Sequence, residues 1–174
     1  YAVVGALNAP SLEASNLWAW GQNNNGQLNQ NDVINRSSPV LVSSRTSWST
    51  AAWVGQQEFF VGIKSDGTLW SSGNNSSGQL GQNDRVNRSA STQVGALANW
   101  SAVNATTNHV VAVKTDGTLW AWGGNLRGQL GQNDTIYRSS PVQIGALTTW
   151  LRVSTGDNYT SFAIKTDGTL WSWG

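Results

Sequence analysis

The chain has 174 residues, a net charge of +1 and charged side chains at only 11% of its positions, so we expect neither a nucleic-acid surface nor an acidic tail. No apolar run is long enough to insert into a membrane, and the absence of cysteine excludes disulfides, thiolate metal sites and cysteine nucleophiles. Eleven Trp and nineteen Gly stand among many Asn, Ser and Thr, a polar but nearly uncharged composition that is typical of extracellular and virion proteins.

A repeated sequence organises nearly the whole chain. The Leu-Trp pair that opens each copy begins at residues 17, 69, 119 and 170, at spacings of 52, 50 and 51 residues. Tandem periods of this size indicate a single repeat array. We divide it into an abbreviated repeat at 1–16, full repeats at 17–68, 69–118 and 119–169, and the start of a fourth repeat at 170–174. In the abbreviated repeat, VGAL at 4–7 matches IGAL at 144–147.

Within a repeat, the pattern predicts short strands separated by turns. In the third copy, a strand is expected at 118–122 (TLWAW), then an Asn- and Gly-rich loop, then strands at 141–145 (PVQIG) and 148–153 (TTWLRV). The segment FAIKTDGTLWSWG at 162–174 predicts a hairpin with Asp-Gly at its turn, because Gly adopts the positive φ that such turns need. The same turn recurs in each copy, so the expected turn residues are Asp66, Asp116 and Asp167.

Four strands per repeat with a tryptophan signature predict an all-β fold, a β-propeller of four-stranded blades. Side chains alternate along a strand, so Leu119 and Ala121 face one side of the blade and Trp120 and Trp122 face the other. Both sides are apolar, as expected for a blade packed between two neighbours. Structural roles are therefore assigned to the repeated tryptophans and to the leucines of the GQL loops, which would fill the seams between blades: Trp18, Trp20, Trp70, Trp120, Trp122, Trp171, Trp173, Leu28, Leu80 and Leu130.

The motifs GQLG, LWxWG and the Lys-x-Asp-Gly hairpin, at this spacing, resemble the regulator of chromosome condensation repeat. The resemblance implies a seven-bladed propeller, of which about three and a half blades are present. In that family a His commonly stands three residues before the Ala of the third strand; here the place holds Phe59, His109 and Thr160, and we expect His109 to be structural. An open stack would expose Trp-rich faces and strand edges. We expect either a fragment of a longer chain, which the break within a repeat favours, or a ring of several chains.

Residues that recur in every copy are attributed to the fold. The Asp-Arg pairs of the long loops, four residues apart, would tie each loop to itself or to the next blade, and Lys64, Lys114 and Lys165 are expected in solvent. With one His and no Cys, we expect no catalytic residues, no metal site, no cofactor and no enzyme activity. The nucleotide exchange and chromatin binding for which the family was named use charged surface loops, which this chain lacks.

The hypothesis that remains for the function of the protein is a structural and adhesive module of a virion fibre, such as a phage tail fibre, or of a cell-surface fibre. Such a module would be located outside the cell. Its partners would be other blades of a longer chain or other fibre subunits, together with a glycan or cell-surface receptor bound through many weak contacts. The alternatives are a scaffold that binds protein partners and an accessory domain of a larger protein. The candidate binding residues vary within the same loop of each repeat: Asn23, Asn24, Asn25, Asn75, Ser76, Ser77, Asn125, Leu126 and Arg127.

Overall fold

The structure, a computed structural model, describes residues 3–5, 17–43, 48–55, 58–156 and 159–174. Within these ranges the chain forms fourteen strands and no helix, which confirms the all-β prediction. The same ranges accordingly hold no helix of the length and hydropathy that crossing a membrane requires. The strands are β1 (Val3–Gly5), β2 (Leu17–Gly21), β3 (Arg36–Ser43), β4 (Trp48–Gly55), β5 (Phe59–Lys64), β6 (Leu69–Gly73), β7 (Arg88–Gln93), β8 (Trp100–Ala105), β9 (His109–Lys114), β10 (Leu119–Gly123), β11 (Arg138–Gln143), β12 (Trp150–Thr155), β13 (Ser161–Lys165) and β14 (Leu170–Trp173).

The strands form four antiparallel sheets, which we call blades I to IV in chain order. Blades II (β4–β7) and III (β8–β11) have four strands each, in the order of the chain. Blades I (β1–β3) and IV (β12–β14) have three strands each within the described residues. Consecutive strands pair in every blade, so each blade is a simple meander.

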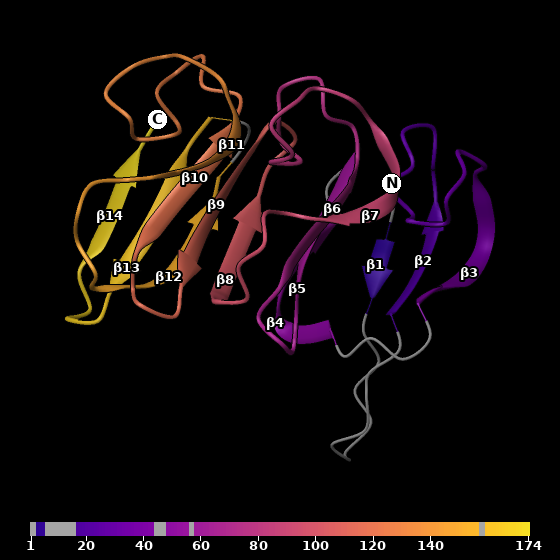
Figure 1. Ribbon diagram of the computed structural model, residues 1–174, viewed down its shortest axis with the longest axis horizontal. Coiled ribbons are helices and arrows are strands. Elements are labelled where there is room, and N and C mark those ends of the chain that lie inside the picture. Colours follow the sequence, from indigo (N-terminus) through magenta and orange to yellow (C-terminus); the bar gives the residue numbers. More distant parts are fainter. Residues whose placement is uncertain (1–2, 6–16, 44–47, 56–57, 157–158) are drawn as a thin grey trace.

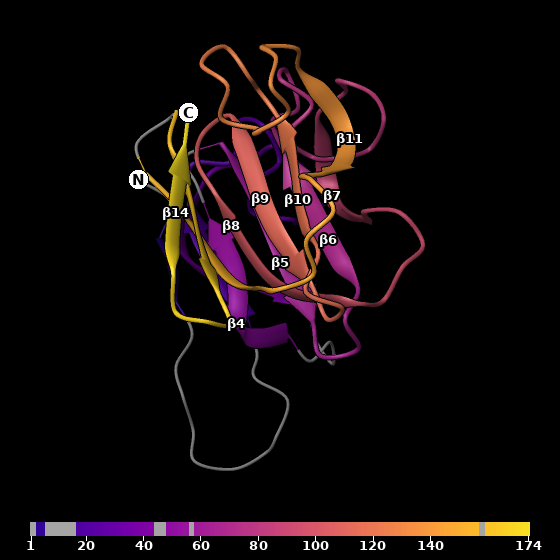
Figure 2. The ribbon, with the colours of Figure 1, turned by 90° about the vertical axis from the view of Figure 1, so that its left-hand side faces the viewer.

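The blades stand side by side, as Figure 1 shows from the indigo blade I to the yellow blade IV, and Figure 2 shows the stack from its end. The first strands of blades II, III and IV, which are β4, β8 and β12, lie against one another. These strands therefore form the inner edge of the stack, and the remaining strands of each blade radiate from it. This arrangement confirms the predicted propeller architecture.

The hairpin turns form as the sequence predicts. In blade III, β9 pairs with β10, with Val113 opposite Leu119, and Gly117 in the turn has a φ of 77°. Asp116 Oδ1 accepts hydrogen bonds from Thr118 Oγ1 at 2.6 Å and from Thr118 N at 3.0 Å. These bonds to the carboxylate hold the pKa of Asp116 below its usual value. Asp66 and Asp167 make the same pair of bonds in their own hairpins.

The apolar core lies in the seams between blades. The largest cluster joins Phe59 and Leu80 of blade II to Trp100, Val103 and Trp122 of blade III, and defines seam II/III. Two smaller clusters fill seam I/II and seam III/IV. The GQL leucines are buried in all three repeats, as predicted: Leu28, Leu80 and Leu130. Burial of such side chains on both faces of a sheet is what stacks the blades.

Two predicted segments differ from the observed strands. The PVQIG strand begins at Arg138, because Arg138 pairs with Gly123, and it ends before Gly145, whose φ is 61°. The predicted match of VGAL at 4–7 to IGAL at 144–147 falls partly on residues 6–7, which lie outside the described residues; its first two residues belong to Val3–Gly5, a strand that pairs with β2. It thus takes the place that β9 has beside β10.

The sequence repeat and the blade are out of phase. The repeat at 69–118 supplies β6 and β7, the outer strands of blade II, and then β8 and β9, the inner strands of blade III. The repeat at 119–169 crosses from blade III to blade IV in the same way. Each repeat therefore links two blades covalently.

Candidate functional site

One buried asparagine closes each GQL loop. Asn75 Nδ2 donates to the main-chain oxygen and to Oδ1 of Asp84, both at 3.0 Å, and Asn75 Oδ1 accepts from Leu80 N at 2.9 Å. The same bonds recur in the first and third repeats. The prediction that Asn23, Asn75 and Asn125 contact a ligand is wrong, because these side chains are fully buried and their amides hold the loop.

The Asp-Arg pairs tie each loop to itself. Arg88 Nη2 lies 2.6 Å from Asp84 Oδ2, and Arg88 Nη1 donates to the main-chain oxygen of Val86 at 2.7 Å. The bond from Arg88, followed by the bond from the backbone N–H of Val86, lowers the pKa of Asp84. The pairs Asp32–Arg36 and Asp134–Arg138 have the same geometry. Of the two predicted roles for these pairs, closure within one loop is the observed one.

The other candidate loop residues lie at the surface. Asn24, Ser76, Leu126 and Arg127 are exposed, while Asn25 and Ser77 are half-buried. Asn25 Oδ1 accepts from Asn87 Nδ2 at 3.2 Å, so this position links the loops of blades I and II. A ligand role for the exposed positions stays a prediction.

The hairpin lysines are not in open solvent, contrary to the prediction. Lys114 is only 6% exposed, and its Nζ lies 3.6 Å from the ring centroid of Trp120 and 4.8 Å from that of Trp100. The two indoles meet edge to face at 6.0 Å. Burial lowers the pKa of Lys114, because desolvation disfavours the charged ammonium. Lys64 and Lys165 lie over Trp70 and Trp171 in the same way.

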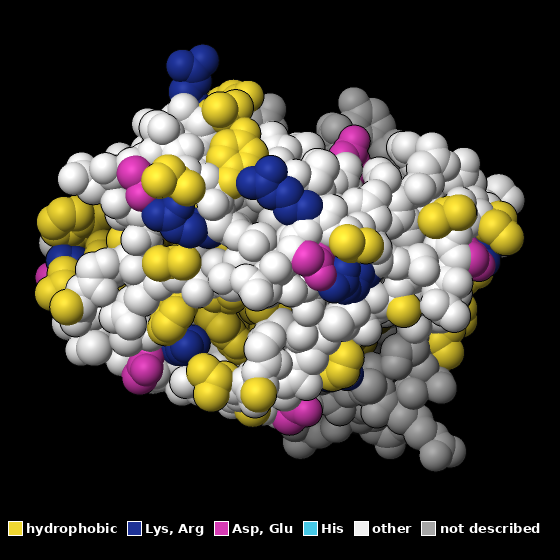
Figure 3. Space-filling view, turned by 45° about the horizontal axis from the view of Figure 1, so that its top comes forward, with side chains coloured by type: hydrophobic (Ala, Val, Ile, Leu, Met, Phe, Trp, Pro, Cys, Tyr) yellow, Lys and Arg dark blue, Asp and Glu magenta, His cyan; other side chains and the backbone are white. Residues whose placement is uncertain are grey.

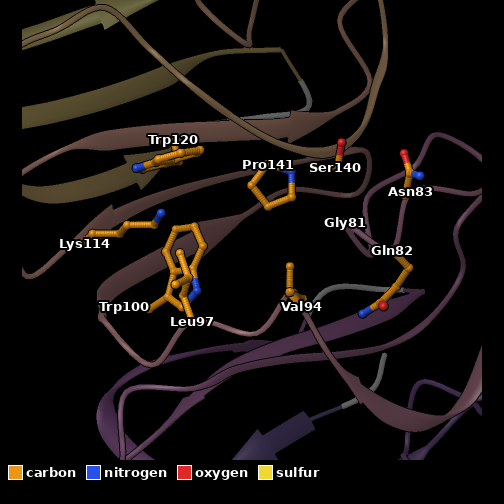
Figure 4. A pocket seen from close by; sticks show the side chains of 11 residues that line it. Gly81, Gln82, Asn83, Val94, Leu97, Trp100, Lys114, Trp120, Ser140 and Pro141 are labelled. Atoms are coloured by element: carbon orange, nitrogen blue, oxygen red, sulfur yellow. The ribbon is translucent and has the colours of Figure 1, made fainter.

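A groove of about 350 Å³ opens beside the Lys114 stack, in seam II/III. Trp100, Trp120 and Lys114 form one end, and the loop that follows β7 contributes Leu97 (Figure 4). Pro141 of β11 forms a wall. The polar side chains of Asn83 and Ser140 lie at the other end, away from Lys114 (Figure 4). We call this site the seam II/III groove.

Two residues distinguish this groove from the corresponding place in seam I/II. There, Asn29 Oδ1 accepts a hydrogen bond from Ser91 N, and this bond bridges blade I to blade II. The equivalent positions in seam II/III hold Gly81, which has no side chain, and Pro141, which has no N–H. The groove was missed from the sequence, although this difference between otherwise similar repeats was a usable signal.

The single His has the structural role that was predicted. His109 is fully buried, with Nδ1 2.8 Å from Thr106 Oγ1 and Nε2 2.9 Å from Ser161 Oγ. Ser161 Oγ donates to the main-chain oxygen of Gln129 at 2.8 Å, so its own proton is committed. His109 Nε2 must therefore carry the hydrogen that the serine accepts. This chain of hydrogen bonds joins blades III and IV.

The described ranges show no group of three His, Cys, Asp or Glu side chains that could hold a metal ion. The three Asp-Arg pairs form ion pairs within their own loops, and the three turn aspartates accept hydrogen bonds within their own hairpins. Among the described residues, the seam II/III groove is a place where side chains of several strands converge with polar groups that make no side-chain hydrogen bond.

Comparison with known proteins identifies the repeat. The family model described as the regulator of chromosome condensation (RCC1) repeat matches residues 15–56, 66–113 and 116–163, and a second model of the same repeat matches 100–129. A curated relative, the RCC2 homolog of Danio rerio, is 30% identical over 70 residues, which is 40% of this chain and 14% of the relative.

Solved structures share the fold. Human WBSCR16 has a TM-score of 0.77 at 19% identity, covering 91% of this chain and 42% of its own. Prp20p of Saccharomyces cerevisiae, studied with its binding to Gsp1p and histones, has a TM-score of 0.76 at 21% identity, covering 93% of this chain and 41% of its own. The chain therefore spans less than half the length of these relatives.

Proposed function

Since the chain belongs to the RCC1 repeat family of β-propellers, we propose that it serves as a non-enzymatic recognition module of a virion or cell-surface fibre that binds glycans. It acts outside the cell, by equilibrium binding rather than by chemistry. The observation that carries this proposal is the seam II/III groove, in which two indoles and an ammonium meet uncommitted polar side chains on a rigid frame. Sites of this size, mostly apolar with a few placed polar groups, are typical of small-ligand binding.

The repeat architecture supports recognition by many weak contacts. The blades present equivalent loops and equivalent Lys-Trp stacks, and each further seam with the glycine and proline of seam II/III would present a further groove. Linked weak sites reach an avidity well above the affinity of any one of them. A fibre that presents several copies of the propeller gains the same advantage.

The test compares monovalent with multivalent protein on a panel of immobilised glycans. We expect weak or transient binding by the single chain, and binding by a streptavidin-linked tetramer that is stronger by a factor of about 100 or more. Biolayer interferometry on acidic and neutral glycans provides the measurement. Failure of the tetramer to bind any glycan on the panel would overturn the proposal.

A second candidate function is a protein-binding scaffold. Each Asp-Arg loop carries an exposed aliphatic side chain at an equivalent position, and the three are each 62% exposed: Ile34, Val86 and Ile136. Figure 3 shows acidic, basic and apolar side chains grouped together repeatedly across one face. The structure of Prp20p was described together with the binding of that protein to Gsp1p and histones. The test is the variant Val86→Ser. If it no longer binds a defined protein partner while its glycan binding is unchanged, the second function is favoured.

A further inference from the structure

We propose that the seam II/III groove binds an acidic sugar, with the sugar carboxylate against the Lys114 ammonium. This assignment rests on the proposed glycan-recognition function and narrows its ligand class. The sugar is either a free uronic or sialic acid or the terminal residue of a glycan, because the recognised chemistry is the same. The groove volume of about 350 Å³ suits one or two sugar rings.

The charge of the groove selects an anion. Lys114 is the one charged side chain among the residues that line it. The Lys114 residue is only 6% exposed, and its ammonium makes no hydrogen bond or ion pair with the described residues. It lies against the faces of Trp120 and Trp100, and the carboxylate of Asp116, in the hairpin turn, acts on it only through its electric field. Buried charges are normally paired, since an unpaired one carries a desolvation cost. A ligand carboxylate supplies the missing partner.

A second donor at the same end of the groove lacks a partner. The indole Nε1 of Trp100 is buried and makes no hydrogen bond within the described residues. The neighbouring indole Nε1 of Trp120, in contrast, donates to Thr118 Oγ1 at 2.8 Å. The equivalent indoles of Trp48 and Trp150 are also buried without a hydrogen bond, so this feature belongs to every blade and the Lys114 ammonium is the donor that is particular to the groove. A carboxylate has two oxygens that only accept, which suits that donor.

The rest of the groove suits a sugar ring better than a simple anion. Leu97 and Pro141 offer apolar contact for the C–H face of a ring, next to the two indoles. At the far end, the amide of Asn83 and the hydroxyl of Ser140 make no side-chain hydrogen bond with described residues and can serve sugar hydroxyls (Figure 4). A cation at one end, apolar walls and free polar groups at the other end match a carboxylate carried on a hydroxylated ring.

The corresponding stack in seam I/II provides an internal control. Lys64 Nζ lies 3.5 Å from the ring centroid of Trp70, so seam I/II has the same contact between an ammonium and an indole face. The Asn29–Ser91 bond, however, crosses the place that Gly81 and Pro141 leave open in seam II/III. The two lysines thus share a stack on an indole but differ in access to a groove, and Lys64 is half-buried whereas Lys114 is buried.

The first experiment titrates the full chain with methyl β-D-glucuronide and with methyl β-D-glucoside, which has the same ring without the carboxylate. Isothermal calorimetry or the quenching of tryptophan fluorescence reports binding. We expect the glucuronide to bind at least about tenfold more tightly than the glucoside, since a hydrogen bond to a charged group carries that difference. An oligosaccharide ending in glucuronate or sialate distinguishes a glycan terminus from the free sugar acid as the better ligand.

The matched variants are Lys114→Met and Lys64→Met, which keep the buried stem and remove the ammonium in one seam at a time. Lys114→Met should lose the tenfold preference for the glucuronide, and Lys64→Met should retain it. A second pair avoids any change in the core: Ser140→Glu places a negative charge at the groove and should weaken glucuronide binding, whereas Ala90→Glu, at the equivalent place of seam I/II, should not.

Equal binding of the two sugars, or glucuronide binding that survives both Lys114→Met and Ser140→Glu, would overturn the assignment. Such a result leaves the broader glycan-recognition proposal standing if the tetramer still binds the glycan panel. Tight binding of an acidic peptide in place of the sugars would also overturn it and would favour the protein scaffold. Absence of all glycan binding removes both the assignment and the proposed function.

Discussion

Seams I/II and II/III join sheets of the same topology, yet different chemistry fills them. In seam II/III, Trp122 is fully buried and its Nε1 donates to the main-chain oxygen of Gln79 at 3.0 Å. A Cβ at Gly81 would lie 2.9 Å from that nitrogen, so glycine makes room for the indole. Seam I/II instead has Ser72 at the tryptophan position and Asn29 at the glycine position.

The difference shows that a seam is specified by a set of residues that change together. A bulky indole requires a glycine opposite it, whereas a small serine permits an asparagine that reaches across to Ser91. The polar solution is less complete, because the hydroxyls of Ser72 and Ser91 are buried without hydrogen-bond partners among the described residues. An unsatisfied buried hydroxyl is destabilising. Seam I/II should therefore be the weaker joint.

The largest expected effect comes from removing the indole of seam II/III. Trp122→Ser should lower the free energy of unfolding by about 3–5 kcal/mol, since it leaves a cavity and frees the Gln79 carbonyl. Urea unfolding followed by circular dichroism measures the loss. Trp20→Ser, at the equivalent place of blade I where the indole is only half-buried, should cost less. A loss below about 1 kcal/mol for Trp122→Ser would contradict the ranking of the seams.

A double-mutant cycle tests whether the seam residues act as a set. Ser72→Trp alone should destabilise by about 1–3 kcal/mol, because the Asn29 side chain stands where the indole must go. Asn29→Gly added to Ser72→Trp gives seam I/II the tryptophan–glycine pair of seam II/III. In that background Ser72→Trp should lower the free energy of unfolding by about 1–2 kcal/mol less than it does alone. Urea midpoints of the four proteins give the coupling. Additive effects would show that the two positions are independent.

A smaller effect is expected where blades III and IV join. His109→Phe gives blade III the residue that blade II has at Phe59, and it removes the hydrogen bonds to Thr106 and Ser161. The loss should be about 1–2 kcal/mol, because the ring size is kept and the hydroxyls lose a partner. Thermal unfolding of this variant beside Phe59→Leu, an apolar change at the equivalent place, separates lost hydrogen bonding from altered packing. Unchanged stability would mean that the buried network contributes nothing.

The smallest difference between the seams is expected on acidification. The pKa values of Asp84 and Asp134, one in the loop of each complete blade, are lowered below 3.8 in the folded chain. Each contributes stability that is fully present above pH 3.8 and is lost as the pH falls through the lower folded pKa. The urea concentration at the midpoint of unfolding should decrease as the pH is lowered below about 4. Asp84→Asn and Asp134→Asn should each make the urea midpoint less dependent on pH, and by the same amount. Unequal pH dependences in the two variants would show that low pH destabilises one seam before the other.

The features that the sequence predicted are local or repeated. The Asp-Gly turns depend on one backbone conformation, and the burial of Leu80 and its equivalents follows from their repetition in a blade with two apolar faces. The burial of Lys114 was not predictable in the same way, because its exposure depends on indoles contributed by two other strands. The burial of Asn75 was also missed, since a loop asparagine that binds Asp84 looks the same in sequence as one that faces solvent.

The seam II/III groove could not be predicted from local sequence patterns, for a further reason. It exists because Gly81 and Pro141, which belong to different blades, both lack a group that their equivalents have. Pairing them requires the stacking of blades II and III, which no local pattern reveals. The comparison of equivalent positions between repeats would nevertheless have drawn attention to both residues.

The phase shift between repeat and blade has a consequence for inheritance. Because the repeat at 69–118 carries the outer strands of one blade and the inner strands of the next, a duplication of that length copies the segment that links two blades covalently. A duplication does not copy a fitted set of seam residues, since Gly81 lies in one repeat and its partners Trp122 and Pro141 lie in the next. Each new joint in a lengthened array would therefore have to be fitted by later substitutions. The differences between the joints at Asn29 and Gly81, and at their partners in the following repeat, are of the kind that such fitting requires.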